Sequence, residues 1–167
     1  DDMVSRGLGD VYKRQQLNTI NDATSVAVDL TNVTALAASS LSDLGTLATA
    51  ITNNEFDNDT GLTTIAVSDN TIDATTLAAR IDSFDTISGG SSNTGMTLAA
   101  GATINVDSGE IAHMLADETA GRLTISDQKI TVNSAGTITV DTANLLAATT
   151  TGVITCLLYT SDAADEV

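Results

Sequence analysis

The sequence predicts a mixed α/β repeat fold: a solenoid-like stack of strand–helix–strand units with a period of about 39 residues. The main observation is a short alternating apolar and polar pattern that occurs four times, at residues 25–29, 64–69, 103–107 and 137–141. The first apolar residues of successive copies are about 39, 39 and 34 residues apart. Segments with helical spacing lie between the copies. A parallel β-solenoid with short helical corners is the alternative architecture.

Each copy of the pattern is expected to form a β-strand, because its apolar residues alternate and are mostly β-branched. Two apolar side chains of each copy point the same way: Val26 and Val28, Ile65 and Val67, Ile104 and Val106, Ile138 and Val140. An aspartate ends each copy, and an aspartate before a helix can accept its free backbone N–H groups. We therefore expect helix caps at Asp29, Asp69, Asp107 and Asp141.

Helices are expected where apolar residues recur three and four positions apart. The clearest case is residues 74–81, where Ala74, Leu77, Ala78 and Ile81 follow this spacing. Further helices are predicted at residues 41–51, 111–115 and 145–146.

Returning strands and turns are expected in the remaining segments. Strands are predicted at residues 84–88, 122–126 and 129–133. The last of these is expected to pair with residues 137–141 as a hairpin. Residues 89–95, with the sequence GGSSNTG, are the most loop-like part of the chain.

Both ends of the chain differ in composition from its middle. Residues 1–15 and 156–167 contain both tyrosines, the only cysteine and three of the six basic residues. These flanks resemble translated sequencing-adapter DNA at the ends of reading frames from environmental sequence assemblies; ordinary terminal tails are the alternative. We expect a repeat domain at residues 16–155, taken from a longer protein. Its units are predicted near residues 24–62, 63–101, 102–135 and 136–155.

The chain is strongly acidic, with 22 acidic residues, six basic residues and a net charge of −16. This composition argues against nucleic acids and anionic membrane surfaces as partners, because both require a basic protein surface. No apolar run reaches the roughly 18 residues of a transmembrane helix, so no membrane insertion is expected. Many threonines and alanines with few lysines and aromatic residues are typical of secreted bacterial surface proteins.

Three segments carry a family resemblance: DNTIDATTL at residues 69–77, VDTANLL at 140–146 and TTTGVIT at 149–155. They resemble repeats of giant secreted proteins of aquatic bacteria, described as hemolysin-like or calcium-binding repeat proteins. The resemblance covers most of residues 17–155 and transfers no catalytic residue. It implies a structural or adhesive protein at the cell surface or outside the cell. Its implied partners are neighbouring repeats of the same chain and other cell-surface molecules.

Calcium is the one cofactor that the sequence suggests. The glycine-rich repeat of calcium-binding β-rolls does not occur, and residues 55–61 depart from the EF-hand pattern. Within that segment, Asp57 and Asp59 offer oxygen ligands at alternate positions. A solvated turn between the first two units is the favoured interpretation, and a weak calcium site at Asp57 and Asp59 is the alternative. The aspartates that end the strands also permit a carboxylate ladder, although helix capping explains them more simply.

The sequence shows no catalytic motif, and we expect no enzymatic activity. His113 is the only histidine, and we expect it to be a partly exposed or packed side chain on a short helix. The histidine and cysteine ligands that zinc prefers are scarce, and no G-x-S-x-G nucleophile motif occurs. A polysaccharide-acting enzyme on a parallel β-helix is the rival class. It is disfavoured because residues 16–155 hold three basic residues and no tyrosine or tryptophan.

Overall fold

The computed structural model describes residues 14–31, 33–57, 62, 64–87, 95–133 and 138–157. Within these ranges the chain forms a mixed α/β fold. Its helices are α1 (Arg14–Asp22), α2 (Leu41–Thr52), α3 (Ala74–Ile87), α4 (Ile111–Thr119) and α5 (Val140–Thr149). Its strands are β1 (Val28–Asp29), β2 (Ala35–Ser39), β3 (Phe56–Asp57), β4 (Thr64–Val67), β5 (Thr71–Asp73), β6 (Gly95–Leu98), β7 (Thr103–Val106), β8 (Leu123–Thr124), β9 (Lys129–Val132) and β10 (Ile154–Cys156).

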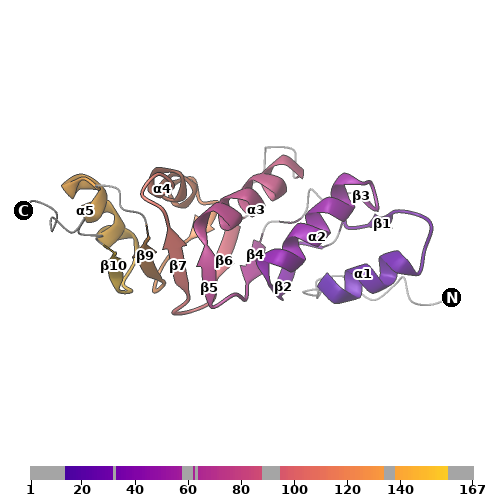
Figure 1. The fold of residues 1–167 in the computed structure, drawn as a ribbon. Coiled ribbons are helices and arrows are strands. Elements are labelled where there is room, and N and C mark those ends of the chain that lie inside the picture. The colour runs from indigo at the N-terminus through magenta and orange to yellow at the C-terminus, as the bar shows by residue number, and fades with distance from the viewer. Residues whose placement is uncertain are drawn as a thin grey trace, which may run out of the picture.

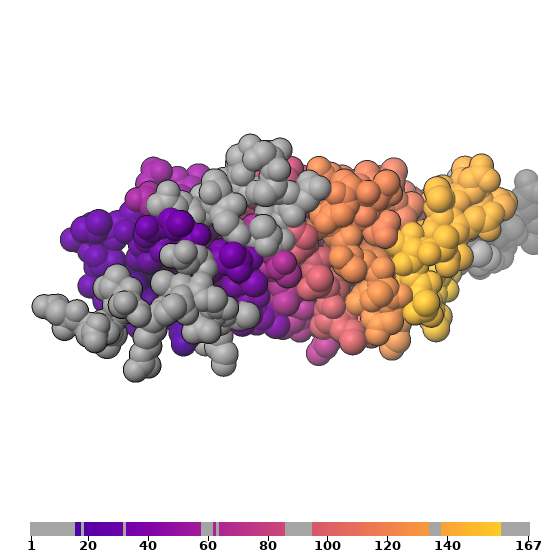
Figure 2. Space-filling model, turned by 180° about the vertical axis from the view of Figure 1, so that it is seen from behind, coloured from indigo at the N-terminus to yellow at the C-terminus, as the bar shows by residue number. Residues whose placement is uncertain are grey.

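The molecule is elongated, and the chain advances from one end to the other (Figures 1 and 2). In Figure 2 the colours follow one another from indigo to yellow along the long axis. Helices α2 to α5 lie side by side above the strands in Figure 1, and each contacts the next. Segments that are close in the sequence are therefore also close in space.

Two parallel four-stranded sheets run along the molecule. The first, called sheet one, has the order β2-β4-β6-β8, and the second, called sheet two, has the order β10-β9-β7-β5. A separate parallel pair joins β1 to β3. Parallel neighbours require a long crossover connection. The connection from β4 to β6 passes through β5 and α3, and the connection from β6 to β8 passes through β7 and α4.

Large apolar residues stack in register along both sheets. Partners in sheet one are Leu36, Ile65, Met96 and Leu123, and partners in sheet two are Ile72, Ile104, Ile130 and Ile154. The first three isoleucines of sheet two are 0% exposed. Burying such a side chain is worth about 1.5–3 kcal/mol. These two apolar ladders, covered by the helices, form the centre of the core.

Helix α3 extends further than the sequence predicted. Leu77, Ile81 and Phe84 are buried at spacings of four and three residues, which is one face of a helix. The predicted strand at residues 84–88 is therefore wrong, because Phe84 lies on the buried face of α3 and the helix ends at Ile87. The remainder of that strand and the predicted loop before Gly95 lie outside the described residues.

The predicted hairpin between residues 129–133 and 137–141 is also wrong. Strand β9 is present, but it pairs in parallel with β7 on one side and β10 on the other. Val140 begins α5, because the Thr139 hydroxyl accepts the backbone N–H of Thr142 at 3.1 Å and caps the helix. Ile138 precedes that cap, and residues 134–137 lie outside the described residues.

The four copies of the alternating pattern do not occupy equivalent positions. The first copy forms only the short β1, and its Val26 is 72% exposed. The second is β4 in sheet one, the third is β7 in sheet two, and the fourth begins α5. Paired strands are offset by 24 residues between Ile130 and Ile154 and by 32 between Ile72 and Ile104. The 39-residue spacing is therefore not the structural step, because any strand with one buried face shows this alternation.

Both ends of the described chain cross the predicted flank boundaries. Helix α1 begins at Arg14, contacts α2 and buries Leu17. Strand β10 ends at Cys156, which pairs with Val132 of β9. The domain boundaries at residues 15/16 and 155/156 stay predictions.

Candidate functional site

The aspartates of the predicted calcium site lie on the segment after α2. Asp57 is exposed at the end of β3, where it pairs in register with Asp29 of β1. Asp59 lies outside the described residues. Asp29 already accepts the backbone N–H of Thr31 at 2.9 Å and its hydroxyl at 2.6 Å. Among the described residues, no three His, Cys, Asp or Glu side chains gather as candidate metal ligands.

The predicted helix caps are mostly elsewhere. Asp69 accepts the backbone N–H of Leu41 at 2.7 Å, so it contacts the start of α2 and not of the helix that follows it. The cap of α3 is Asp73, which accepts the backbone N–H of Thr76 at 2.8 Å. Asp69 lies too early to cap α3, because β5 intervenes between β4 and that helix.

The other three aspartates do not cap helices. Asp29 forms the local turn with Thr31, and Asp141 lies in the first turn of α5 after the Thr139 cap. Asp107 contributes its backbone carbonyl, which accepts the N–H of Glu110 at 2.9 Å. Since the four aspartates belong to different environments, they do not form the carboxylate ladder that the spacing permitted.

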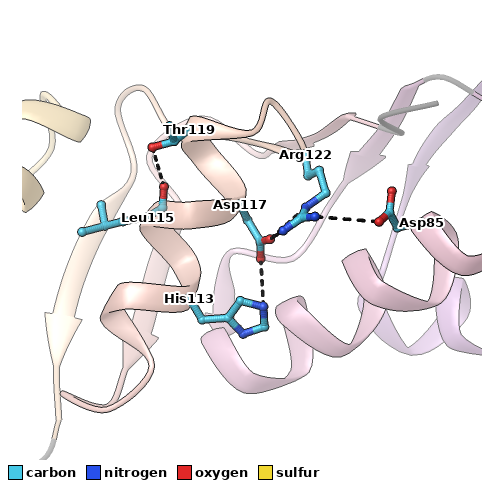
Figure 3. A network of polar contacts seen from close by, with 6 residues as sticks. All are labelled: Asp85, His113, Leu115, Asp117, Thr119 and Arg122. Atoms are coloured by element: carbon cyan, nitrogen blue, oxygen red, sulfur yellow. Dashed lines mark hydrogen bonds and ion pairs between the residues drawn. The ribbon is translucent and has the colours of Figure 1, made fainter. Parts of the chain in front are cut away.

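A polar network joins α3, α4 and the start of β8 (Figure 3). Asp117 on α4 is 1% exposed, and its Oδ1 accepts Nε of Arg122 at 3.0 Å and Nη2 at 2.5 Å. Arg122 Nη1 also lies 3.8 Å from Oδ2 of Asp85 on α3. His113 Nε2 lies 3.8 Å from Oδ2 of Asp117, which is too long for a hydrogen bond.

The backbone turn that ends α4 places the side chain of Arg122 next to that of Asp117. Gly121 adopts a φ of 74°, and its N–H donates to the carbonyl of Glu118, while Arg122 N–H donates to the carbonyl of Asp117. These two bonds and the left-handed glycine form a Schellman motif, which reverses the chain after a helix. The guanidinium is thereby folded back onto a carboxylate from the last turns of the same helix.

The Asp117 hydrogen bond is the largest influence on Arg122, and it raises the pKa of the guanidinium above its ordinary value. Burial opposes this by lowering that pKa, whereas the charges of Asp117, Asp85 and Asp82 raise it. Stabilisation by Arg122 is thus complete below the ordinary arginine pKa and is lost only as the pH rises through the raised value. The guanidinium stays charged at every pH at which the folded chain would be studied.

Through Arg122, this network links Asp117 of α4 to Asp85 of α3. Oδ2 of Asp117 is buried without a hydrogen-bond partner, and the side chain of His113 is 42% exposed. The expectation of a partly exposed His113 on a short helix is confirmed. Sequence reasoning missed the Asp117–Arg122 pair. A helix followed by Gly121 and a basic residue was the available signal.

A groove of about 400 Å³ lies between α2 and α3. Its lining residues are Gly45, Ala48, Thr49, Thr52, Asn53, Arg80, Asp82 and Ser83. A Cβ atom on Gly45 would lie 2.6 Å from Cζ of Arg80, so the missing side chain allows the guanidinium to rest on α2. The Nε atom of Arg80 is buried and has no hydrogen-bond partner. Sequence reasoning did not single out this arginine.

No protein-family model, curated protein or solved structure matches the chain.

None of the helices in the described ranges combines the length and apolar character that crossing a membrane would require.

Proposed function

We propose that this chain is a structural segment of a solenoid-like scaffold, belonging to a larger secreted or cell-surface protein, without enzymatic activity. One unit of the scaffold consists of a strand in sheet one, a strand in sheet two and a helix. The observation that carries the proposal is the in-register stacking of one large apolar residue per strand along both sheets. Such a unit buries its apolar side chains only against its neighbours, which is the property of repeat architectures.

The segments that lead into the strands of sheet two support the same proposal, because hydrogen bonds join each of these segments to the next. Gln128 is buried, and its Nε2 donates to the carbonyl of Ala99 at 3.1 Å in the preceding unit. The hydroxyl of Thr150 in the following unit donates to the carbonyl of Gln128 at 2.6 Å. Gly152 allows this close approach, because a Cβ there would lie 2.2 Å from the Gln128 carbonyl oxygen.

The proposed location and partners rest on composition. The chain carries a net charge of −16, few basic residues and few aromatic ones, which suits a soluble extracellular surface in a saline medium. The proposed role is therefore spacing and surface presentation, with neighbouring repeats of the same chain and other cell-surface molecules as partners.

Excision of one whole unit tests the scaffold. Leu123 is the register partner of Met96, 27 residues earlier, so removing residues 96–122 joins Gly95 to Leu123 in the same register. We expect the shortened chain to fold cooperatively with a lower Tm, because repeat stability is approximately a sum over units and their interfaces. Small-angle X-ray scattering should show a maximum dimension shorter by about 5–10 Å, which is one strand or helix spacing.

The matched control removes half a unit, residues 96–109, which joins Gly95 to Glu110 out of register. We expect this variant to lose its cooperative transition, because apolar residues would leave both ladders. If the whole-unit and half-unit excisions lost structure equally by circular dichroism, the scaffold proposal would be wrong.

A further inference from the structure

The groove between α2 and α3 is lined by Arg80, a cation with no partner among the residues that the structure describes. Arg80 has no hydrogen bond or ion pair with any described residue, although the chain holds 22 acidic residues. Arg122, by contrast, is paired with Asp117 and lies near Asp85. An arginine that rests on a helix with a buried, unpartnered Nε leaves its charge available to an anion from outside the protein.

Gly45 leaves the space in the groove that the guanidinium of Arg80 occupies. Glycine inside a helix costs about 1 kcal/mol relative to alanine. Gly45 nevertheless occupies the middle of α2, where a Cβ would lie within 3 Å of Cζ, Nη2 and Nε of Arg80. The absent side chain keeps the guanidinium against α2, at the wall of the groove.

The hydroxyls that line the groove have already used their hydrogens. Thr49 donates to the carbonyl of Gly45 at 3.0 Å, and Thr52 donates to the carbonyl of Ala48 at 2.9 Å. Ser83 donates in the same way to Ala79 at 2.7 Å. A hydroxyl whose hydrogen is committed can still accept. The groove therefore offers one cationic donor group and several acceptors, including the carboxylate of Asp82.

We propose that this groove binds a small hydroxylated carboxylate, of the size and chemistry of a single uronic acid. The carboxylate would pair with Arg80, and the ligand hydroxyls would donate to the Thr49, Thr52 and Ser83 oxygens. The volume of about 400 Å³ is sufficient for a ligand of this size. A single negative charge fits better than a polyanion, because Asp82 lines the groove and the net charge of the chain is −16.

The test is a titration of the isotope-labelled chain, followed by two-dimensional NMR, with sodium glucuronate, glucose and acetate as separate probes. We expect glucuronate to cause saturable shifts at groove residues, with an affinity in the millimolar range. Glucose lacks the charge and acetate lacks the hydroxyls, so each should bind about tenfold more weakly. Acetate binding as tight as glucuronate binding would overturn the role given to the hydroxyl oxygens.

Three variants separate binding from folding. Arg80→Gln should weaken glucuronate binding by about tenfold or more, whereas Lys129→Gln removes a basic residue elsewhere and should leave it unchanged. Gly45→Ala retains Arg80 but displaces its guanidinium, because the added Cβ would overlap it. This variant should therefore also weaken glucuronate binding. The spectra themselves report whether each variant is folded. Shifts that are unchanged by Arg80→Gln, or absent in the wild type at millimolar glucuronate, would overturn the site.

This proposal goes beyond the scaffold and is tested independently. Excision of residues 96–122 leaves α2 and α3 in place, so the shortened chain should retain the groove.

Discussion

Asp117 and Arg122 show how a single buried acid is accommodated in this chain. The Asp117 carboxylate is 1% exposed, and one of its oxygens accepts two guanidinium hydrogens from Arg122. Removing one partner of a buried pair is costly because the other charge remains without compensation. Arg122 is partly exposed, so water can compensate for some of that loss.

We predict that Asp117→Ala lowers the free energy of unfolding by about 2–4 kcal/mol. The matched control is Asp85→Ala, which removes the more distant and more exposed acid near the same arginine and should cost about 0–1 kcal/mol. Urea denaturation at neutral pH measures both. Equal losses for the two variants would contradict the assignment of Asp117 as the principal partner of Arg122.

At the scale of single elements, the helix starts depend on side chains that the linear pattern did not identify. Helix α3 is capped by Asp73, the last residue of β5. Helix α2 is capped by Ser40, whose Oγ accepts the N–H of Asp43, and Asp69 from the next unit adds a bond to Leu41. The start of α2 is thus stabilised both by an adjacent residue and by a residue of the next pair of strands.

We predict that Asp73→Ala destabilises the chain by about 1 kcal/mol, because the N–H groups at the start of α3 lose their acceptor. Asp107→Ala is the control, because it removes the same charge. The contact of Asp107 with the N–H of Glu110 is made by its backbone carbonyl, which the substitution retains. The control should change stability by less than about 0.5 kcal/mol. Thermal and urea unfolding measure both variants. A larger loss of stability for Asp107→Ala than for Asp73→Ala would contradict the assignment of Asp73 as the cap.

At the scale of the whole molecule, the net charge of −16 opposes compaction through self-repulsion. We predict that Tm rises with sodium chloride concentration, since the Debye length falls from about 10 Å at 0.1 M to about 3 Å at 1 M. Calorimetry at several salt concentrations measures the effect. A Tm that fell or stayed constant with added salt would show that the acidic surface does not limit stability.

The same measurement distinguishes the two interpretations of Asp57 and Asp59. A calcium site predicts a larger rise in Tm with calcium than with magnesium at equal ionic strength, and Asp57→Asn should remove the difference. A solvated turn predicts equal shifts. Asp107→Asn is the control, because it removes the same charge far along the chain.

Local pattern predicted many of the elements. The spacing of Leu77 and Ile81 predicted α3, and alternating isoleucines and valines predicted β4, β7 and β9. The failures occurred where one pattern fits two structures. Phe84 extends α3, where it follows Ile81 by three residues on the buried face, and Val140 begins a helix because a threonine cap precedes it. These outcomes depend on the residues that pack against each segment. The spacing of apolar residues along the chain does not specify those contacts.

The sequence by itself determined a mixed α/β chain with an acidic surface, because apolar spacing and charge are local properties of the residues. Only the tertiary structure decided which sheet each strand joins, the offsets of 24 to 32 residues between paired strands, and the neighbours of Asp117 and Arg80. These features depend on contacts between residues that are distant in the sequence. The repeated alternating pattern therefore indicated strands but not their positions in the stack.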